Sequence, residues 1–278
     1  MNENENKEFN LHTHSWYCGH GVGELSEYVD VALKGGLSVL GFSEHCPMPS
    51  ERWPGSRMPF KSLETYLGEC RALQSSNSEI SILTGLECDY DPLFHNWYQE
   101  YLLDSHRVDY LIAGVHYLTN DVVIDRYIQH FPNDRKALYA YTDSYIETLS
   151  SGLFSYCVHP DLFGMFYAEW DSDAIACSRA ILECASSLSI PLEINGYGLN
   201  KPHISTKMGK RRQYPFHSFW FLSKEYDIKI VASSDAHRPT DVVSQLEDAL
   251  SFAKELELEL SSLIINTSKD GNRTLLFT

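Results

Sequence analysis

Several features that mark other classes of protein are missing from this chain of 278 residues. No apolar run approaches the roughly 20 residues needed to cross a bilayer, and the first eight residues are polar and acidic instead of forming an apolar leader. The seven cysteines are odd in number and form no Cys-x-x-Cys pair, so a disulfide framework is not expected. We therefore expect a cytoplasmic protein without a membrane partner and with a flexible tail over residues 1–8.

Positive charge is scarce as well. The chain has 22 Lys and Arg against 38 Asp and Glu, a formal net charge of −16. An acidic surface repels the phosphates of a polynucleotide, so no nucleic acid partner is expected. A small anion attracted by bound cations remains compatible with this charge, and no feature of the sequence specifies an oligomeric state.

A glycine-rich phosphate loop after the first expected strand is also missing, which disfavours an open dinucleotide-binding sheet. Instead, short apolar runs alternate with amphipathic patterns. The runs predict strands at residues 9–14, 38–43, 80–87, 110–116, 154–159, 190–195 and 228–234. The amphipathic patterns predict helices at residues 24–34, 63–74, 96–103, 136–150, 172–188, 216–226 and 240–256. Seven such units without a linker predict one α/β domain over residues 1–278, a closed or nearly closed barrel.

Three connections, residues 46–61, 117–135 and 196–215, are longer than a simple turn between a strand and a helix. We expect them to overhang the carboxyl ends of the strands and to shape a substrate pocket there. Residues 262–278 hold two apolar patches around a polar turn, which predicts a closing hairpin or an edge strand.

Residue types that bind metals gather at the ends of the expected strands. His12 and His14 are two residues apart, so their side chains point to the same face of a strand. Further members are His20, His45, Glu87, His116, His159, Asp235 and His237. The carboxyl ends of all barrel strands meet on one rim, where barrel enzymes build their sites. Burying nine such groups together is costly without cations, so the sequence predicts a metal site.

Two more acids lie beside these residues. Glu44 directly precedes His45, and we expect it to hydrogen-bond a ligand imidazole. Glu193 lies at a strand end, as a structural residue or as part of the pocket wall.

Seven segments, taken in order, resemble the PHP (polymerase and histidinol phosphatase) superfamily and, within it, the stand-alone histidinol-phosphate phosphatases. They are residues 12–21 (HTHSWYCGHG), 41–47 (GFSEHCP), 85–90 (GLECDY), 113–117 (AGVHY), 158–162 (VHPDL), 192–195 (LEIN) and 233–239 (SSDAHRP). Each segment alone is weak, but the ordered set is specific and covers nearly the whole chain.

The resemblance implies a distorted seven-stranded (β/α)7 barrel of the PHP, TIM-like kind. It also implies a trinuclear metal centre, with three sites that bind two to three divalent ions. Zinc, iron and manganese all suit its donors. For the first ion the resemblance implies His12, His14, Glu87 and Asp235. Glu87 would bridge to a second ion held by His116 and His159, and the third ion would be held by His20, His45 and His237.

The function implied is that of a metal-dependent phosphomonoesterase acting on a small phosphorylated substrate, with histidinol phosphate of histidine biosynthesis as the first candidate. Bound cations would neutralise the ester and activate water, while Asp235 or His237 would act as the catalytic residue that protonates the leaving oxygen. Alternatives are a phosphatase for another small ester or a nucleotide, a nuclease acting on nucleotide ends, an amidohydrolase-like hydrolase on the same barrel, and a polymerase accessory module. The amidohydrolase alternative would call for a bridging lysine at a strand end, and none of the runs ends in lysine.

The expected substrate-binding residues are Tyr117, Asn195, Lys201, Arg211 and Arg212. The chain departs from the family at two places near them. Residues 198–201 read GLNK where relatives tend to have GLRK, and residues 160–165 (PDLFGM) lack an expected basic residue. The first departure indicates that a phosphate-binding arginine has moved in this chain, and both leave the identity of the leaving group open without affecting the expected hydrolysis.

Overall fold

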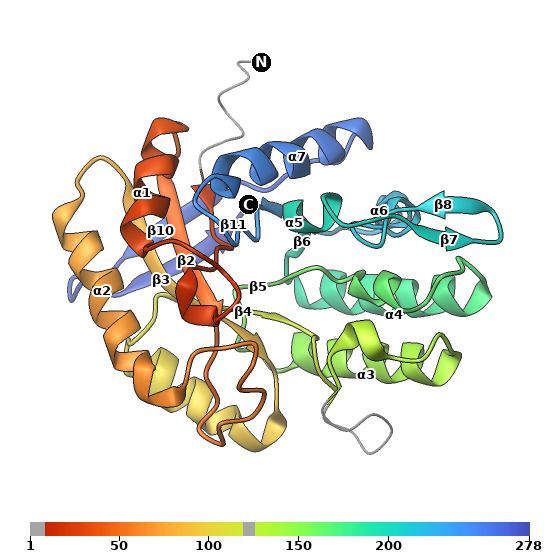
Figure 1. Cartoon of the computed structure of the whole chain (residues 1–278), viewed down its shortest axis with the longest axis horizontal. Helices are drawn as coiled ribbons and strands as arrows, with labels where there is room; N and C mark the ends of the chain where they lie inside the picture. Colours follow the sequence, from red (N-terminus) through yellow and green to blue (C-terminus); the bar gives the residue numbers. More distant parts are fainter. Residues whose placement is uncertain (1–8, 119–125) are drawn as a thin grey trace.

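A computed structural model describes residues 9–118 and 126–278 of the chain. Its main sheet has seven parallel strands in the order β1-β2-β3-β4-β5-β6-β9 (Figure 1). The strands are β1 (Phe9–Asn10), β2 (Val39–His45), β3 (Ser81–Asp89), β4 (Tyr110–Gly114), β5 (Tyr156–Cys157), β6 (Leu192–Asn195) and β9 (Ile230–Ser233). Each of the seven runs predicted from the sequence overlaps one of these strands, and β2 and β3 continue two residues beyond their runs.

The first and last strands of this order approach each other beyond their ends. Thr13 and Ala236 form an isolated parallel bridge, and the backbone N–H of His14 donates to the carbonyl of Ala236 at 2.8 Å. This contact nearly closes the sheet into a barrel, so the prediction of a seven-stranded α/β barrel is confirmed.

Helices follow the strands at the predicted places. They are α1 (Leu25–Lys34), α2 (Leu63–Ser76), α3 (Arg135–Ser150), α4 (Ser172–Leu188), α6 (His217–Ser223) and α7 (Asp241–Glu255), with the π-helix η4 (Trp97–Asp104) in the position expected for a seventh α-helix. Carboxylates stabilise two of the helix starts, because Asp134 accepts from the N–H of Ala137 and Asp171 from that of Ala174. Within the described residues, no helix is both long and apolar enough to cross a membrane.

Short elements occupy the connections. The 3-10 turns are η1 (Trp16–Cys18), η2 (Phe60–Ser62), η3 (Pro92–Phe94), η5 (Ile128–His130) and η6 (Leu162–Met165). The long connection at residues 196–215 is more regular than expected, because it holds α5 (Gly196–Leu199) and an antiparallel pair, β7 (Ile204–Thr206) and β8 (Gly209–Arg211). The expected tail at residues 1–8 and part of the second long connection lie outside the described residues.

The chain ends in the predicted hairpin, formed by β10 (Leu263–Thr267) and β11 (Arg273–Phe277). Phe277 is buried against the side chains inside the barrel, with its ring centroid 5.6 Å from that of Tyr156 and 6.3 Å from that of Phe9. The hairpin therefore packs against the interior of the barrel near the start of β1, away from the carboxyl ends of the strands.

Asn10 joins the two strands that nearly close the barrel. Its fully buried amide donates to Ser234 Oγ at 2.6 Å and to the Val242 carbonyl at 2.9 Å, and it accepts from the N–H of Ser234 at 3.2 Å. Replacing Asn10 by Ala removes all three bonds. Ser234 Oγ keeps its bonds to the His12 carbonyl and the Ala236 N–H, but the buried N–H of Ser234 loses its acceptor, at a cost of roughly 1–3 kcal/mol. We expect the free energy of unfolding, measured in urea, to fall by about 3 kcal/mol.

The matched control is Asn200→Ala, which removes an exposed amide whose bonds to Gly196 and Asp248 are 3.4 and 3.3 Å long. A change within about 0.5 kcal/mol is expected there. If Asn10→Ala lowers stability no more than this control, the barrel does not depend on Asn10 for its closure.

Candidate metal centre

The structure brings the nine candidate ligands together at the carboxyl ends of the strands. Glu87, at the end of β3 and 1% exposed, lies at the centre of the cluster. Its two oxygens are 2.8–3.6 Å from ring nitrogens of His12, His14, His45, His116 and His159. Asp235 lies 3.2 Å from His14 and 3.6 Å from His237, and His237 is 3.0 Å from His20. Residues more than 220 positions apart thus line one small space.

Hydrogen bonds to the Nδ1 atoms of His20 and His237 leave the Nε2 atoms of the two rings facing each other. Their Nδ1 atoms lie 3.1 and 2.9 Å from the carbonyls of Cys18 and Asp235. A carbonyl only accepts, so each Nδ1 carries the ring proton. Burial, together with the charge of His14, lowers the pKa of both imidazoles, that of His237 to about 3. Two Nε2 lone pairs therefore face each other at 3.0 Å, an arrangement that a cation between them would stabilise.

The inner part of the cluster attracts positive charge. His12 donates through Nδ1 to Glu193 at 2.7 Å, and its Nε2 lies 3.0 Å from Nε2 of His14. Burial alone would lower the pKa of His14, but Asp235 and Glu87 raise it to about 9. Burial likewise opposes the charged form of His12, yet Glu193, Asp235 and Glu87 hold its pKa well above the ordinary value. Divalent cations would supply the positive charge that protons otherwise provide here.

Several donor atoms in the cluster are buried without a hydrogen-bond partner. They are Nδ1 of His14, His45, His116 and His159, and Oε2 of Glu87. His45 Nδ1 and Glu87 Oε2 lie only 2.8 Å apart, yet they are not oriented to bond each other. In three groups of three residues drawn from the nine candidates, all the donor atoms lie within 4.8 Å of one another: His12, His14 and Glu87; His14, His45 and His237; and His45, Glu87 and His116. Nitrogen and carboxylate donors at this spacing fit divalent transition metals.

Two acids support the cluster in ways that the sequence did not reveal. Glu193, expected as a structural or pocket residue, orients the ring of His12. Asp89 accepts from the backbone N–H of His116 at 2.6 Å and forms an ion pair of 2.8 Å with Arg57. The spacing Glu87-Cys-Asp89 was a usable signal, because residues two apart on a strand share a face.

Glu44 has a different role from the one expected. One of its oxygens accepts from both the N–H and the hydroxyl of Ser15 at 2.6 Å, while the other lies 3.9 Å from His14 Nδ1. Burial raises the pKa of Glu44 to about 7. Within the described residues Glu44 thus holds the segment after His14, and it forms no hydrogen bond with an imidazole.

A cavity of about 330 Å³ opens beside the cluster. It is lined by His20, His45, Gly55, Ser56, Arg57, His116, Tyr117 and Tyr127. Residues from the connections 46–61 and 117–135 thus cover the donor set, as expected. The rings of Trp53 and Tyr117 stack with centroids 4.6 Å apart, which gives this cover an aromatic wall.

The structure does not bring Arg211 and Arg212 to this cavity. The guanidinium of Arg211 donates to the carbonyls of Gly164, Tyr167, Ala168, Arg212 and Gln213. Arg212 lines a separate depression with Leu199, Asp248 and Phe252. The expectation that these two residues contact substrate is therefore not supported, because Arg211 holds the segment around β8 and Arg212 faces α7.

The other three substrate candidates lie closer to the donor set. Tyr117 lines the cavity, and its hydroxyl donates to Ser56 at 3.1 Å. Lys201 Nζ lies 3.8 Å from the ring centroid of Tyr197, which in turn stacks on His237 at 4.8 Å. Asn195 donates to Asp235 at 3.1 Å, so it contacts a candidate ligand directly.

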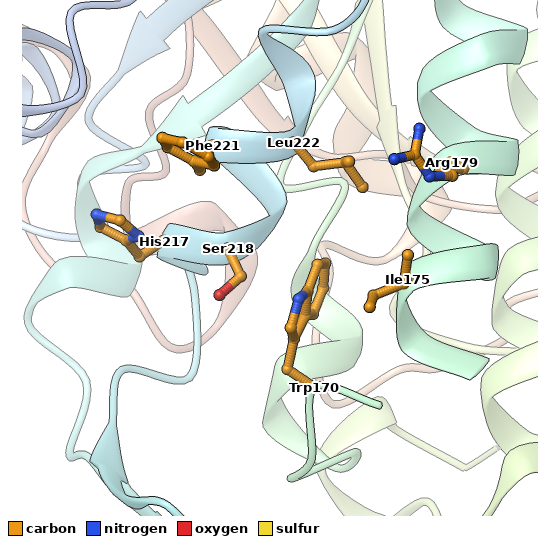
Figure 2. Close-up of a pocket in the computed structure, with 7 residues that line it drawn as sticks. All are labelled: Trp170, Ile175, Arg179, His217, Ser218, Phe221 and Leu222. Atoms are coloured by element: carbon orange, nitrogen blue, oxygen red, sulfur yellow. The ribbon is translucent and has the colours of Figure 1, made fainter. Parts of the chain in front are cut away.

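A second hollow, of about 380 Å³, lies between α4 and α6 and shares no residue with the donor set. Figure 2 shows Trp170, Ile175 and Leu222 around it, with Arg179 at one side. Arg179 forms an ion pair of 2.7 Å with Glu225. Among its lining residues His217 is the single imidazole and Arg179 is paired, so this hollow offers no cluster of metal donors like the one at the barrel rim.

The seven-stranded β/α barrel and the histidine and carboxylate side chains on its rim place this protein in the class of barrel proteins with clustered metal donors. This chain belongs to the PHP domain family, which matches residues 10–196. It is 31% identical over 254 residues to a probable histidinol-phosphatase of Deinococcus radiodurans, covering 88% of this chain and 92% of that protein. It is 25% identical to a probable histidinol-phosphatase of Schizosaccharomyces pombe, covering 95% of this chain and 91% of that protein.

A solved structure has the same fold. The crystal structure of histidinol phosphate phosphatase from Lactococcus lactis, complexed with zinc, L-histidinol and phosphate, superimposes with a TM-score of 0.71 at 20% identity. The match covers 92% of this chain and 96% of the other chain.

Proposed function

We propose that this protein is a metal-dependent phosphatase that hydrolyses histidinol phosphate to histidinol and phosphate. The observation that supports it most is the complete set of nine nitrogen and carboxylate donors around Glu87, in a chain that aligns along nearly its whole length with probable histidinol-phosphatases.

The nine candidates divide into the three groups that the family resemblance implies. His12, His14, Glu87 and Asp235 would hold one ion, Glu87 with His116 and His159 a second, and His20, His45 and His237 a third. When bound, such ions neutralise phosphate charge and lower the pKa of a water. Zinc, iron and manganese are the candidates.

The surrounding side chains orient the substrate and carry protons. Asp235 or His237, which lie 3.6 Å apart, is proposed to pass a proton from the attacking water to the departing oxygen. Tyr117 offers a hydroxyl and an aromatic face to the leaving group, and Lys201 offers a positive charge at the edge of the site. Asn195 acts through its hydrogen bond to Asp235.

The test joins elemental analysis of protein purified without chelator to a phosphate-release screen. The panel contains histidinol phosphate, other small monoesters, nucleotides and short oligonucleotides. We expect two to three equivalents of divalent metal, fastest release from histidinol phosphate, and loss of activity with chelator that added metal reverses. Uncatalysed monoester hydrolysis is extremely slow, so any turnover is readily separated from background. Preference for a nucleotide or an oligonucleotide, or activity that survives complete metal removal, would contradict the proposal.

A further inference from the structure

Arg57 is the arginine among the residues that line the cavity beside the metal donors. It comes from the connection between β2 and α2 and is 4% exposed, so its guanidinium is fixed in place. Nη2 donates to Asp89 at 2.8 Å, Nη1 donates to the carbonyl of Cys46 at 3.0 Å, and Nε has no hydrogen-bond partner. Because a buried guanidinium rarely leaves its N–H donors unpaired, we expect Arg57 to donate a hydrogen bond to an acceptor of the bound ligand.

The ion pair between Arg57 and Asp89 is oriented with its positive end toward the cavity. Asp89 is absent from the cavity wall, and its oxygens accept from the N–H groups of His116 and Tyr117 as well as from Arg57. Arg57, by contrast, lines the wall together with His20, His45 and His116. An anion entering this space would meet the guanidinium on one side and the donor cluster on the other.

We propose that Arg57 is the residue that binds the phosphoryl group of the substrate. It would take the role of the basic residues that family members have, and this chain lacks, at residues 160–165 and 198–201. The planar guanidinium suits two oxygens of one phosphate. Arg211, which the sequence suggested for this role, is bonded to backbone carbonyls instead. This inference rests on the proposed phosphatase function. It adds that the guanidinium of Arg57, besides the bound metal ions, supplies positive charge to the phosphate.

The test measures the dissociation constant of inorganic phosphate for the metal-loaded protein by calorimetry, and its inhibition constant as a product. Arg57→Gln is expected to weaken both by roughly tenfold or more, because charge-assisted hydrogen bonds to phosphate are among the strong ones. Metal content and unfolding temperature are measured alongside. Unchanged phosphate affinity in metal-loaded Arg57→Gln would overturn the proposal.

Arg52 provides a matched control. Its guanidinium lies 4.7 Å from the Trp53 ring, as that of Arg57 does, and pairs with Asp91, but Arg52 does not line the cavity. Arg52→Gln should keep the phosphate affinity of the unaltered protein, and an equal loss in both variants would contradict a specific role for Arg57.

Arg57→Lys decides the case in which Arg57→Gln loses metal because Asp89 is left unpaired. Lysine keeps the charge but not the fork of donors, so phosphate should bind several-fold more weakly, and unchanged binding would overturn the proposal. If the unaltered protein neither releases nor binds phosphate, the proposed function fails. If it does both and the Arg57 variants match it, only the role of Arg57 fails.

Discussion

Replacing Glu87 by Gln is expected to lower kcat/KM by about three orders of magnitude or more, equivalent to about 4 kcal/mol in activation free energy. Glu87 lies 2.8 Å from His45, 3.0 Å from His159 and 3.3 Å from His14, so it contacts rings assigned to all three proposed ions. The amide removes one negative charge and places N–H groups where an oxygen faces imidazole nitrogens. Metal content should fall by at least one equivalent, as measured by elemental analysis after dialysis.

Glu79→Gln provides the control, because Glu79 is exposed and lies just before the other end of β3. It removes the same charge from the chain without touching the cluster, and activity and metal content should stay unchanged. A Glu87→Gln protein that keeps both its metal and its turnover would show that the cluster is not the reaction centre.

The fold was predictable because a buried parallel strand reads as an apolar run. All seven runs overlap strands of the sheet, and the helical pattern at residues 172–188 matches α4 at both ends. The lengths of the strands were harder to predict. β1 and β5 are two residues long although their runs have six, since strand ends depend on which neighbours are present to accept hydrogen bonds.

The candidate ligands could be predicted because barrel geometry collects strand ends on one rim. The side chains that orient these ligands could not be predicted. The hydrogen bond from His12 to Glu193, for example, joins residues 181 positions apart. The role of Arg211 was misjudged for the same reason: a basic residue in a long connection looks free in a sequence. In the folded chain its donors meet carbonyls between Gly164 and Ala168.

Replacing Glu193 by Gln is expected to weaken metal binding 10- to 100-fold, the usual effect of losing a carboxylate that orients a ligand imidazole. The three groups that contact Glu193 all donate: His12 Nδ1 at 2.7 Å, the N–H of His159 at 3.2 Å, and Asn195 Nδ2 at 2.9 Å. The first bonds one carboxylate oxygen and the other two bond the second. A glutamine has one acceptor oxygen, so either orientation of its amide sets N–H against N–H in a fully buried place.

Competition with a coloured chelator measures this loss, and Glu44→Gln shows whether it is specific. Glu44 is also buried beside a candidate ligand, but both its hydrogen bonds go to one oxygen, which a glutamine retains. Its amide nitrogen would face His14 Nδ1, which has no hydrogen-bond partner. Metal affinity should therefore remain near that of the unaltered protein in Glu44→Gln and fall in Glu193→Gln. Equal affinities in the two variants would mean that the ring of His12 is held by the metal and the barrel alone, without help from the carboxylate behind it.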